Sequence, residues 1–348
     1  MAKVMVAMSG GVDSSVAAAL LLQEGYEVIG GTLRLYEPSG QIGPEVGRAA
    51  QVCKTLGIPH FVFDKRQEFE RQVIAPFAEE YDRGLTPNPC IECNKYIKFG
   101  ALLDEALALG CDYIATGHYS RIGRLGERQV IYRPDDAKKD QTYVLWRLTS
   151  RQLDHILMPL GELTKDKVRE IAEGYGFASA HSKESQDICF VPDGDYAAFL
   201  EGRAGAPFQK GEYTDPKGRV LGPHLGHQRY TIGQRKGLGI ALGRPQFVIS
   251  KCPATNRVVL GDEELLFKKR IYINEVNFQA EAYPTAPIAC TAKLRYSAKD
   301  APCILTPLGE GEAVLEFEGP QRAPSPGQSA VFYRGDILLG GGKIVKGE

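Results

Sequence analysis

Hydrophobic positions in the first 120 residues follow two alternating spacings. Apolar runs of strand length lie at 3–8, 27–35, 60–65 and 112–120. Between them, apolar residues recur every three to four positions, which predicts helices over 12–24, 44–56, 67–84 and 95–110. Strands that alternate with helices predict a parallel sheet covered on both faces, so the first part of the chain is expected to be an α/β domain.

The pattern changes near residue 200. Residues 201–268 are rich in glycine and proline and predict turns and short strands. From about residue 269, short β-like runs at 270–278, 288–296, 313–319 and 329–345 are separated by glycine and proline turns, as in a small antiparallel β-barrel. We therefore expect three domains, over residues 1–200, 201–268 and 269–348.

Composition and charge narrow the class of protein. With 43% hydrophobic and 24% charged residues, and no run of eighteen apolar ones, the chain is expected to be cytoplasmic and not membrane-bound. The net charge is only −1, but residues 201–244 hold eight basic residues against three acidic ones, and residues 118–151 hold eight against four. Two such segments suit a polyanion contacted on one face, and they equally suit two solvated surfaces.

The stretch AMSGGVDSSV, residues 7–16, follows the first predicted strand and opens the first helix. Gly10 and Gly11 allow a tight turn, and the exposed amides and positive helix end can hold phosphate. Asp13 is unusual at an anion site unless a divalent cation binds there too. The stretch lacks both the Lys-Ser/Thr of a Walker loop and the G-x-G-x-x-G of a dinucleotide fold.

Cys90 and Cys93 form a C-x-x-C pair with three possible roles. A structural zinc site needs two further ligands, and no second C-x-x-C exists in the chain. Thioredoxin-like chemistry would place the pair directly after a strand, whereas a turn precedes this pair and a helix follows it. A sulfur-carrying role needs one more cysteine, and Cys189 is available at the end of the α/β domain.

Seven motifs together resemble the tRNA-specific 2-thiouridylase family of the N-type ATP pyrophosphatase (PP-loop) superfamily. They are SGGVDSSV, TPNP-x-x-x-CN-x-x-IKF, ATGHY, KDQTYVL, ICF, TIGQRKGLGIA and GQSAVFY-x-GD. The resemblance runs from residue 4 to about residue 343 and implies an adenine nucleotide alpha hydrolase-like catalytic domain, a central tRNA-binding domain and a C-terminal β-barrel. The implied activity is that of a tRNA-uridine 2-sulfurtransferase, which uses ATP and Mg²⁺ to thiolate the wobble uridine at position 34.

The resemblance also implies roles for individual residues. Cys93 matches the nucleophile and Cys189 the persulfide carrier. The implied ATP-binding residues are Ala7, Met8, Ser9, Gly10, Gly11, Val12, Asp13, Ser14, Leu33 and Gly117, with Asp13 also a Mg²⁺ candidate. The implied tRNA-contacting residues are His118, Lys139, Asp140, Gln141, Arg295, Tyr296 and Gln328. The implied partners are tRNAs of the Lys, Glu and Gln type and a sulfur donor such as a cysteine desulfurase or a sulfur-relay protein.

Cys90 departs from the commoner family pattern, in which the motif has Asp-x-x-Cys. Two alternatives follow. Cys90, Cys93 and Cys189 could bind a [4Fe–4S] cluster with one open iron, or Cys93 and Cys189 could work without a cluster as a persulfide and disulfide pair. Two other functions stay open, namely a different PP-loop ligase or amidotransferase acting on a small molecule, and a non-catalytic iron–sulfur RNA-binding protein.

Overall fold

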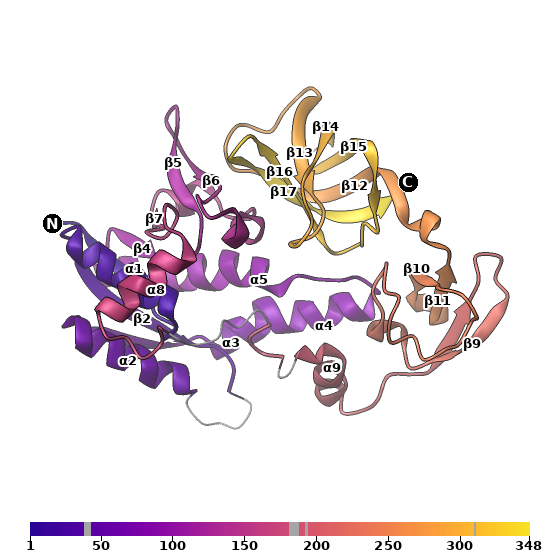
Figure 1. The fold of residues 1–348 in the computed structure, drawn as a ribbon, viewed down its shortest axis with the longest axis horizontal. Helices are drawn as coiled ribbons and strands as arrows, with labels where there is room; N and C mark the ends of the chain where they lie inside the picture. The colour runs from indigo at the N-terminus through magenta and orange to yellow at the C-terminus, as the bar shows by residue number, and fades with distance from the viewer. Residues whose placement is uncertain (38–42, 181–187, 192–193, 310) are drawn as a thin grey trace.

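The computed structural model describes residues 1–37, 43–180, 188–191, 194–309 and 311–348. Its N-terminal part is built on a five-stranded, fully parallel sheet in the order β3-β2-β1-β4-β7 (Figure 1). The strands are β1 (Lys3–Ala7), β2 (Glu27–Arg34), β3 (His60–Asp64), β4 (Tyr113–Ala115) and β7 (Ile156–Leu157). The predicted parallel sheet is therefore confirmed.

Both faces of this sheet are covered because successive residues of β1 enter different cores. Val4 and Val6 pack with α1 (Val12–Gln23), α2 (Pro44–Leu56) and α8 (Lys165–Gly174). Met5 packs on the opposite face with the helical segment that ends in α6 (Leu102–Ala108). All three β1 residues are fully buried, as expected of a strand at the centre of a doubly covered parallel sheet.

Two of the predicted helices are composite segments in which a π-helical stretch lies between two α-helical ones. The first consists of α3 (Arg66–Phe69), the π-helical η1 (Glu70–Ile74) and α4 (Ala75–Asp82). The second begins at Pro89 and consists of α5 (Pro89–Glu92), the π-helical η2 (Cys93–Ala101) and α6. The expected start at residue 95 was wrong, because Asn88 caps the helix and proline is well tolerated in its first turn. Cys90 and Cys93 therefore lie on the helix and not in a turn before it.

The chain between β4 and the central domain holds elements that the hydrophobic pattern did not predict. They are β5 (Arg121–Leu125), β6 (Arg128–Tyr132), η3 (Ala137–Lys139), η4 (Thr142–Val144), α7 (Ser150–Leu153), α8 and α9 (Tyr196–Ala204). The hairpin β5–β6 leaves the N-terminal domain and joins the C-terminal sheet, where Tyr132 pairs with Ile337 of β17.

The central part carries a four-stranded sheet in the order β10-β11-β8-β9. Its elements are β8 (Gly211–Thr214), β9 (Val220–His224), η6 (His227–Arg229), β10 (Phe247–Cys252), η7 (Pro253–Thr255), β11 (Arg257–Gly261) and η8 (Glu263–Leu266). A small core of Tyr213, Tyr230, Val248, Val258 and Leu260 holds it together.

The C-terminal strands form the antiparallel barrel that the sequence predicted. They are β12 (Phe267–Phe278), β13 (Ile288–Lys293), β14 (Ala301–Gly309), β15 (Glu312–Arg322), β16 (Ser329–Arg334) and β17 (Ile337–Gly347). Pairing between β12 and β17 closes the sheet, and Figure 1 shows the barrel above α4 and α5. Among the described residues, no helix is long and apolar enough to span a bilayer.

Candidate active site

The loop between β1 and α1 is held in shape by its own serines. Gly10 adopts a left-handed φ of +72°, and Gly11 follows as the residue that begins the helix. The Ser14 hydroxyl donates to the Gly11 carbonyl at 3.1 Å and lies 3.3 Å from the Ser9 hydroxyl. Backbone amides at the start of α1 are thus left facing outward, which is the arrangement that binds phosphate at a helix N-terminus.

Two glycines let neighbouring segments close around this loop. A Cβ added at Gly10 would lie 2.6 Å from the Cβ of Arg48 on α2. A Cβ added at Gly117, just after β4, would lie 2.8 Å from the Cβ and carbonyl carbon of Asp13 and from the amide nitrogen of Ser14. Since real Cβ atoms do not approach so closely, both positions need glycine. Gly117, one of the predicted ATP-site residues, therefore lies directly against the loop.

Asp13 is held by two side chains that the sequence did not single out. The Tyr119 hydroxyl donates to its Oδ1 at 2.8 Å, and the Lys165 ammonium donates to Oδ1 at 2.7 Å and to Oδ2 at 2.9 Å. Lys165 is buried and stands at the first position of α8, behind the Thr164 cap. The cap and amphipathic pattern of residues 164–174 are a sequence signal for this helix, but nothing in it indicates contact with the loop.

Leu33 lies near the carboxyl end of β2, next to β1 in the sheet. It is half-buried and contacts both the core around Met5 and the aromatic core around Phe77. The neighbouring Thr32 hydroxyl donates to the Met8 carbonyl at 2.9 Å, which ties β2 to the start of the loop. Parallel sheets place ligand sites at this edge, so an adenine ring under Leu33 is a prediction consistent with its position.

The two cysteines of the C-x-x-C pair stand in different surroundings. Asn88 accepts a hydrogen bond from the Cys90 amide at 3.1 Å and so fixes the start of α5. Cys90 is exposed, whereas Cys93 is buried in the aromatic core with Phe77 and Phe190. Cys189 precedes Phe190 and is exposed. Phe190 belongs to the same buried core as Cys93, so Cys189 lies next in sequence to a residue of that core.

The surroundings of all three thiols disfavour the thiolate form and raise its pKa. Burial raises the pKa of the Cys93 thiol to about 12. Cys90 and Cys189 keep accessible surface, yet crowding by protein atoms desolvates them and raises the pKa of both thiols. The positive charge that opposes these shifts at each of the three thiols belongs to Lys98.

Lys98 is a site residue that the sequence analysis missed. It lies five positions after Cys93 in the π-helix η2, whose i to i+5 repeat brings these two positions to the same side of the helix. No ion pair joins it to any of the described residues. Lys98 is the lysine of the IKF motif, but in an ordinary α-helix a residue five positions after Cys93 would point to the opposite side. Only the π-helix places Lys98 on the same side as Cys93.

His118 links the cysteines with the phosphate loop. It is buried, its Nδ1 lies 2.7 Å from the Thr116 hydroxyl, and its ring packs against Phe99. Burial, reinforced by the Lys98 charge, holds the pKa of His118 well below its usual value, so the ring is neutral. Gly117 contacts the phosphate loop, and the charge of Lys98 adds to burial in lowering the pKa of the adjacent His118. One short segment therefore connects the phosphate loop with the surroundings of the cysteines.

A cluster-binding arrangement is not formed. Within the described ranges, no group of three His, Cys, Asp or Glu side chains is placed to hold a metal ion, and Cys90, Cys93 and Cys189 are all inside those ranges. The three thiols do lie close enough for their charges to interact, since ionised Cys90 and Cys189 would each raise the pKa of Cys93.

Of the three predicted tRNA contacts at 139–141, two are engaged inside the protein. Asp140 is buried and accepts hydrogen bonds from Arg133 at 3.0 Å and from the Thr142 amide at 2.9 Å. Gln141 accepts from the Tyr119 amide at 2.8 Å. These two residues therefore shape the segment, and Lys139, at the end of η3, is partly exposed.

The remaining predicted tRNA contacts lie where the barrel meets the other domains. The Arg295 guanidinium donates to the carbonyls of Ile232 at 2.9 Å and Ala323 at 2.8 Å, which ties the central domain to the barrel. Tyr296 is 46% exposed, so its ring is open to solvent beside this junction. Gln328 donates to the Thr86 carbonyl at 2.7 Å and so reaches the turn before Cys90.

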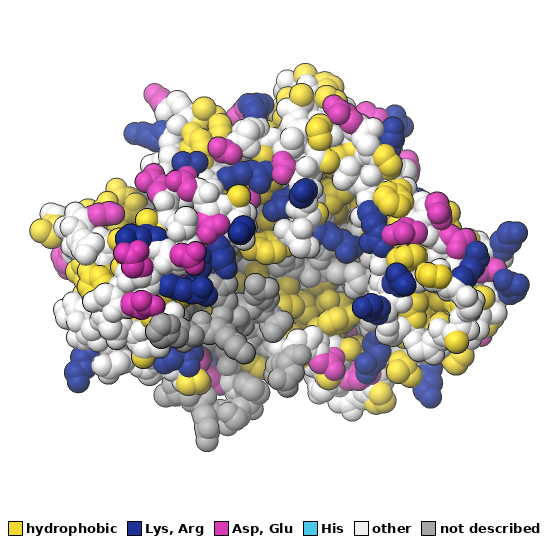
Figure 2. Space-filling model, in the orientation of Figure 1, with side chains coloured by type: hydrophobic (Ala, Val, Ile, Leu, Met, Phe, Trp, Pro, Cys, Tyr) yellow, Lys and Arg dark blue, Asp and Glu magenta, His cyan; other side chains and the backbone are white. Residues whose placement is uncertain are grey.

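Positive side chains gather on one face of the molecule. Figure 2 shows Lys and Arg side chains around a hollowed region in the middle of this face, with hydrophobic side chains on its floor. In the central domain, Arg235 and Lys236 are exposed and form no ion pair with any described residue. Free cations at the surface are the kind of group that contacts a nucleic-acid backbone.

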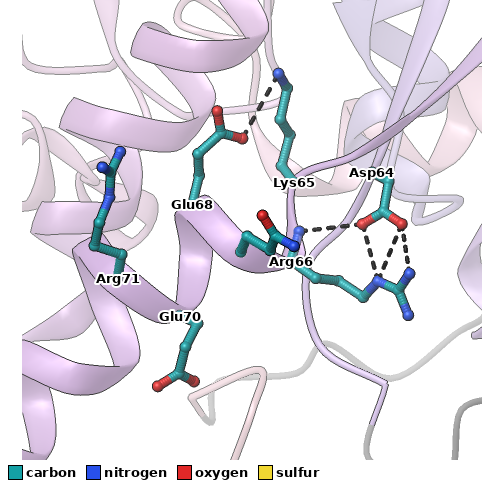
Figure 3. Close-up of a pocket in the computed structure, with 7 residues that line it drawn as sticks. Asp64, Lys65, Arg66, Glu68, Glu70 and Arg71 are labelled. Carbon is teal, nitrogen blue, oxygen red and sulfur yellow. Dashed lines mark hydrogen bonds and ion pairs between the residues drawn. The ribbon is translucent and has the colours of Figure 1, made fainter.

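A large open hollow of about 860 Å³ lies beyond the carboxyl end of β3 (Figure 3), lined by Asp64, Lys65, Arg66, Gln67, Glu68, Glu70 and Arg71. Much of its charge is internally paired. Arg66 contacts the Asp64 carboxylate at 2.5 Å, and the Lys65 ammonium lies 3.6 Å from Glu68. Strand β2 separates β3 from β1, so this hollow is distinct from the phosphate loop.

Comparison with known proteins covers nearly the whole chain. Residues 2–193 match the family model described as tRNA methyl transferase HUP domain, residues 198–262 the tRNA methyl transferase PRC-barrel domain, and residues 268–344 the aminomethyltransferase beta-barrel domain. The chain is 50% identical over 360 residues to the tRNA-specific 2-thiouridylase MnmA of Carboxydothermus hydrogenoformans, which covers 99% of this chain and 98% of that protein. The proteins of the same name from Moorella thermoacetica and Clostridium botulinum strain Alaska E43 are 49% and 46% identical over 351 residues, with 98% of this chain and 98% and 97% of theirs covered.

Proposed function

This chain belongs to the tRNA-specific 2-thiouridylase (MnmA) family, and we propose that it uses ATP to place sulfur on carbon 2 of the wobble uridine, position 34, of tRNA. One observation carries the proposal. The Gly117–His118 segment contacts the phosphate loop at Asp13. The charge of Lys98 adds to burial in lowering the pKa of His118 and also acts on all three thiols. An ATP site and a sulfur site therefore adjoin one substrate position.

The first step is activation of the uracil oxygen. The amides at the start of α1 hold the phosphates of ATP, with the Ser9 hydroxyl as a further donor and Lys165 as a nearby positive charge. The uridine O2 attacks the α-phosphorus, an O–P bond forms, and the bond to the β-phosphate oxygen breaks to release pyrophosphate. The product has AMP as a good leaving group at carbon 2.

Mg²⁺ would neutralise phosphate charge during this step. Asp13 is the carboxylate at the loop, and carboxylate oxygen is the donor type that Mg²⁺ prefers. Both of its oxygens accept hydrogen bonds from Lys165, so this chain also offers a lysine cation for the same purpose. ATP and Mg²⁺ are therefore the small-molecule requirements that we propose.

The second step is sulfur transfer from a persulfide on Cys189. A persulfide is more acidic than a thiol, so its terminal sulfur ionises near neutral pH while the unmodified thiols stay protonated. That sulfur attacks carbon 2 and expels AMP. The Cys93 thiolate then attacks the Cys189 sulfur, breaks the S–S bond, and leaves the transferred sulfur on the base together with a Cys93–Cys189 disulfide. An external thiol reductant must then return the two electrons.

Lys98 provides the charge that this chemistry needs. Cys93 starts with a pKa of about 12, so its deprotonation is unfavourable unless a cation stabilises the thiolate. The same cation also stabilises the ionised persulfide on Cys189. His118 is hydrogen-bonded to Thr116 through Nδ1, and its low pKa favours the neutral ring, so its other ring nitrogen could contact the target base without adding charge.

The resemblance to 2-thiouridylases also implies the partners. The proposed substrates are tRNAs of the Lys, Glu and Gln type, contacted by Lys139, Arg235 and the exposed Tyr296. The sulfur comes from a cysteine desulfurase or a sulfur-relay protein, and the enzyme acts in the cytoplasm. A [4Fe–4S] cluster on the three cysteines is the alternative source of sulfur, although no group of three potential ligands among the described residues is placed to hold a metal ion.

Two measurements test this function. Pyrophosphate release from ATP should depend on unmodified tRNA and fall to background without it, whereas tRNA-independent release would contradict the proposed substrate. Protein purified without oxygen should be colourless, free of iron and sulfide, and active with a cysteine desulfurase. A brown protein that holds iron and loses both iron and activity on Cys90→Ala substitution would instead establish the cluster.

A further inference from the structure

Five charged side chains join the barrel to the helix that carries Cys90 and Cys93. The Lys343 ammonium on β17 lies 2.7 Å from Glu80, 3.7 Å from Glu92 and 3.6 Å from Glu275. The Arg147 guanidinium contacts Glu92 at 2.5 Å and Glu275 at 2.7 Å. Glu92 directly precedes Cys93, so this charge network ends one residue from the proposed nucleophile.

Four of the five side chains in the network are largely shielded from solvent, whereas Glu275 is 44% exposed. The side chains of Glu80, Glu92, Arg147 and Lys343 are between 12% and 20% exposed. One Glu80 oxygen is buried and has no hydrogen-bond partner. Burial would lower the pKa of Lys343, but the hydrogen bond to Glu80 and the three carboxylate charges outweigh it, so the lysine stays charged. Partly buried pairs of this kind couple more strongly than exposed ones.

The barrel strand β12 is irregular where it carries Glu275. This residue has a left-handed φ of +49°, and the pairing of β12 with β17 shifts register between Asn274 and Asn277. A non-glycine residue in this conformation costs free energy and persists only where the surroundings compensate. Here the bulge aims the carboxylate at both Arg147 and Lys343, so the strained position serves the network.

A second set of contacts holds the other end of the same segment. The Thr86 amide donates to the Pro326 carbonyl at 2.8 Å, and Gln328 donates to the Thr86 carbonyl at 2.7 Å. A Cβ on Gly327 would lie 2.7 Å from the Thr86 amide nitrogen, so the barrel turn is pressed against the segment. Residues 86–92 are therefore fixed by the barrel on both sides of Cys90.

We infer that Lys343 is a positioning residue for sulfur transfer. Through Glu92, it holds the helical turn that carries Cys90 and Cys93 at a fixed position relative to the phosphate loop. The inference rests on the proposed function. If the inference holds, the barrel contributes to catalysis as well as to tRNA binding, because its residues set the position of the nucleophile Cys93. The phosphate loop itself receives no contact from this network, so adenylation and sulfur transfer should respond differently to its loss.

The test compares Lys343→Met with Lys343→Arg and with the control Lys346→Met. Lys346 is on the same strand, is 56% exposed and contacts the terminal Glu348. In single-turnover reactions with persulfide-loaded enzyme, Lys343→Met should form 2-thiouridine on the order of tenfold more slowly, as expected when a reacting group is displaced by a fraction of an ångström. The pyrophosphate burst and the Kd for tRNA should stay within about twofold of the wild type. Lys343→Arg should recover most of the rate, and Lys346→Met should match the wild type.

The second variant, Glu92→Gln, removes the carboxylate that directly precedes Cys93 and leaves every residue of the barrel unchanged, and it should slow sulfur transfer in the same way. Faster alkylation of Cys93 by iodoacetamide in Lys343→Met would independently support the inference, because a released turn exposes the thiol. Equal losses of pyrophosphate release and thiolation, or unchanged thiolation in both variants, would overturn it. If neither the wild type nor Lys346→Met forms 2-thiouridine, the proposed function is wrong. The alkylation rates of Cys93 would still test whether Lys343 positions this cysteine.

Discussion

Gly117→Ala should disable the phosphate loop without removing any side chain that takes part in the chemistry. The added methyl would lie 2.8 Å from the Asp13 Cβ, the Asp13 carbonyl carbon and the Ser14 amide nitrogen, about 0.6 Å inside the 3.4 Å at which ordinary contact begins. Two of these three atoms are backbone, so rotation of a side chain cannot relieve the overlap. The first turn of α1 or the loop after β4 must move.

The expected magnitudes follow from that overlap. Overpacking of this kind costs about 1–3 kcal/mol of folding stability, so the protein should still fold. Displacement of phosphate-binding amides by about half an ångström or more should lower the rate of pyrophosphate release by roughly ten- to a hundredfold. Affinity for tRNA should stay within about threefold, because the contacts expected for RNA lie elsewhere.

Gly174→Ala is the matched control. It makes the same chemical change on α8, where an added Cβ meets nothing within 4 Å and the backbone is helical. It should leave activity unchanged and raise stability by up to about 1 kcal/mol. Pyrophosphate release, tRNA binding and thermal unfolding of the two variants form the assay. Wild-type release by Gly117→Ala would refute the assignment of this loop to ATP.

Four further predictions concern other residues of the site. Asp13→Ala should abolish tRNA-dependent pyrophosphate release while tRNA affinity stays within a few-fold, and release at the normal rate would contradict the role of Asp13. Lys98→Met should slow single-turnover thiolation by about tenfold or more, with partial recovery in Lys98→Arg, because the charge stabilises thiolate; equal rates would exclude that role. Cys93→Ala should eliminate thiolation, whereas Cys90→Ala should keep much of it when a desulfurase supplies sulfur, and complete loss in Cys90→Ala would favour the cluster. Arg235→Ala should weaken tRNA binding and lower its salt slope by about one, and an unchanged slope would leave Arg235 as solvated surface.

The layered part of the fold was accessible from the sequence because its signals are local. The apolar run at 3–8 corresponds to β1, and the helix predicted over 44–56 has those bounds in the structure. The hairpin β5–β6 was missed because its stabilising partner is β17, two hundred residues later. The composition of a short basic segment does not indicate which distant strand it will pair with.

The candidate site divides in the same way. The glycine turn of the phosphate loop and the three cysteines were predictable from residue type and order. Lys98 was not, since its place beside Cys93 depends on a π-helix that begins at that cysteine. Nor was Lys165, which reaches Asp13 from a helix more than 150 residues away. The burial of Asp140 and its pairing with Arg133 were not predictable either, because they depend on tertiary packing.

The most direct test of the central claim is transfer of labelled sulfur to a defined atom. The protein would be loaded with ³⁴S from a cysteine desulfurase and mixed with unmodified tRNA of the Glu type, ATP and Mg²⁺. Nucleosides would then be analysed by mass spectrometry alongside AMP and pyrophosphate. We expect ³⁴S on carbon 2 of the uridine at position 34, with one AMP and one pyrophosphate formed for each sulfur. Formation of AMP and pyrophosphate without sulfur in the tRNA, or sulfur at another base, would contradict the account.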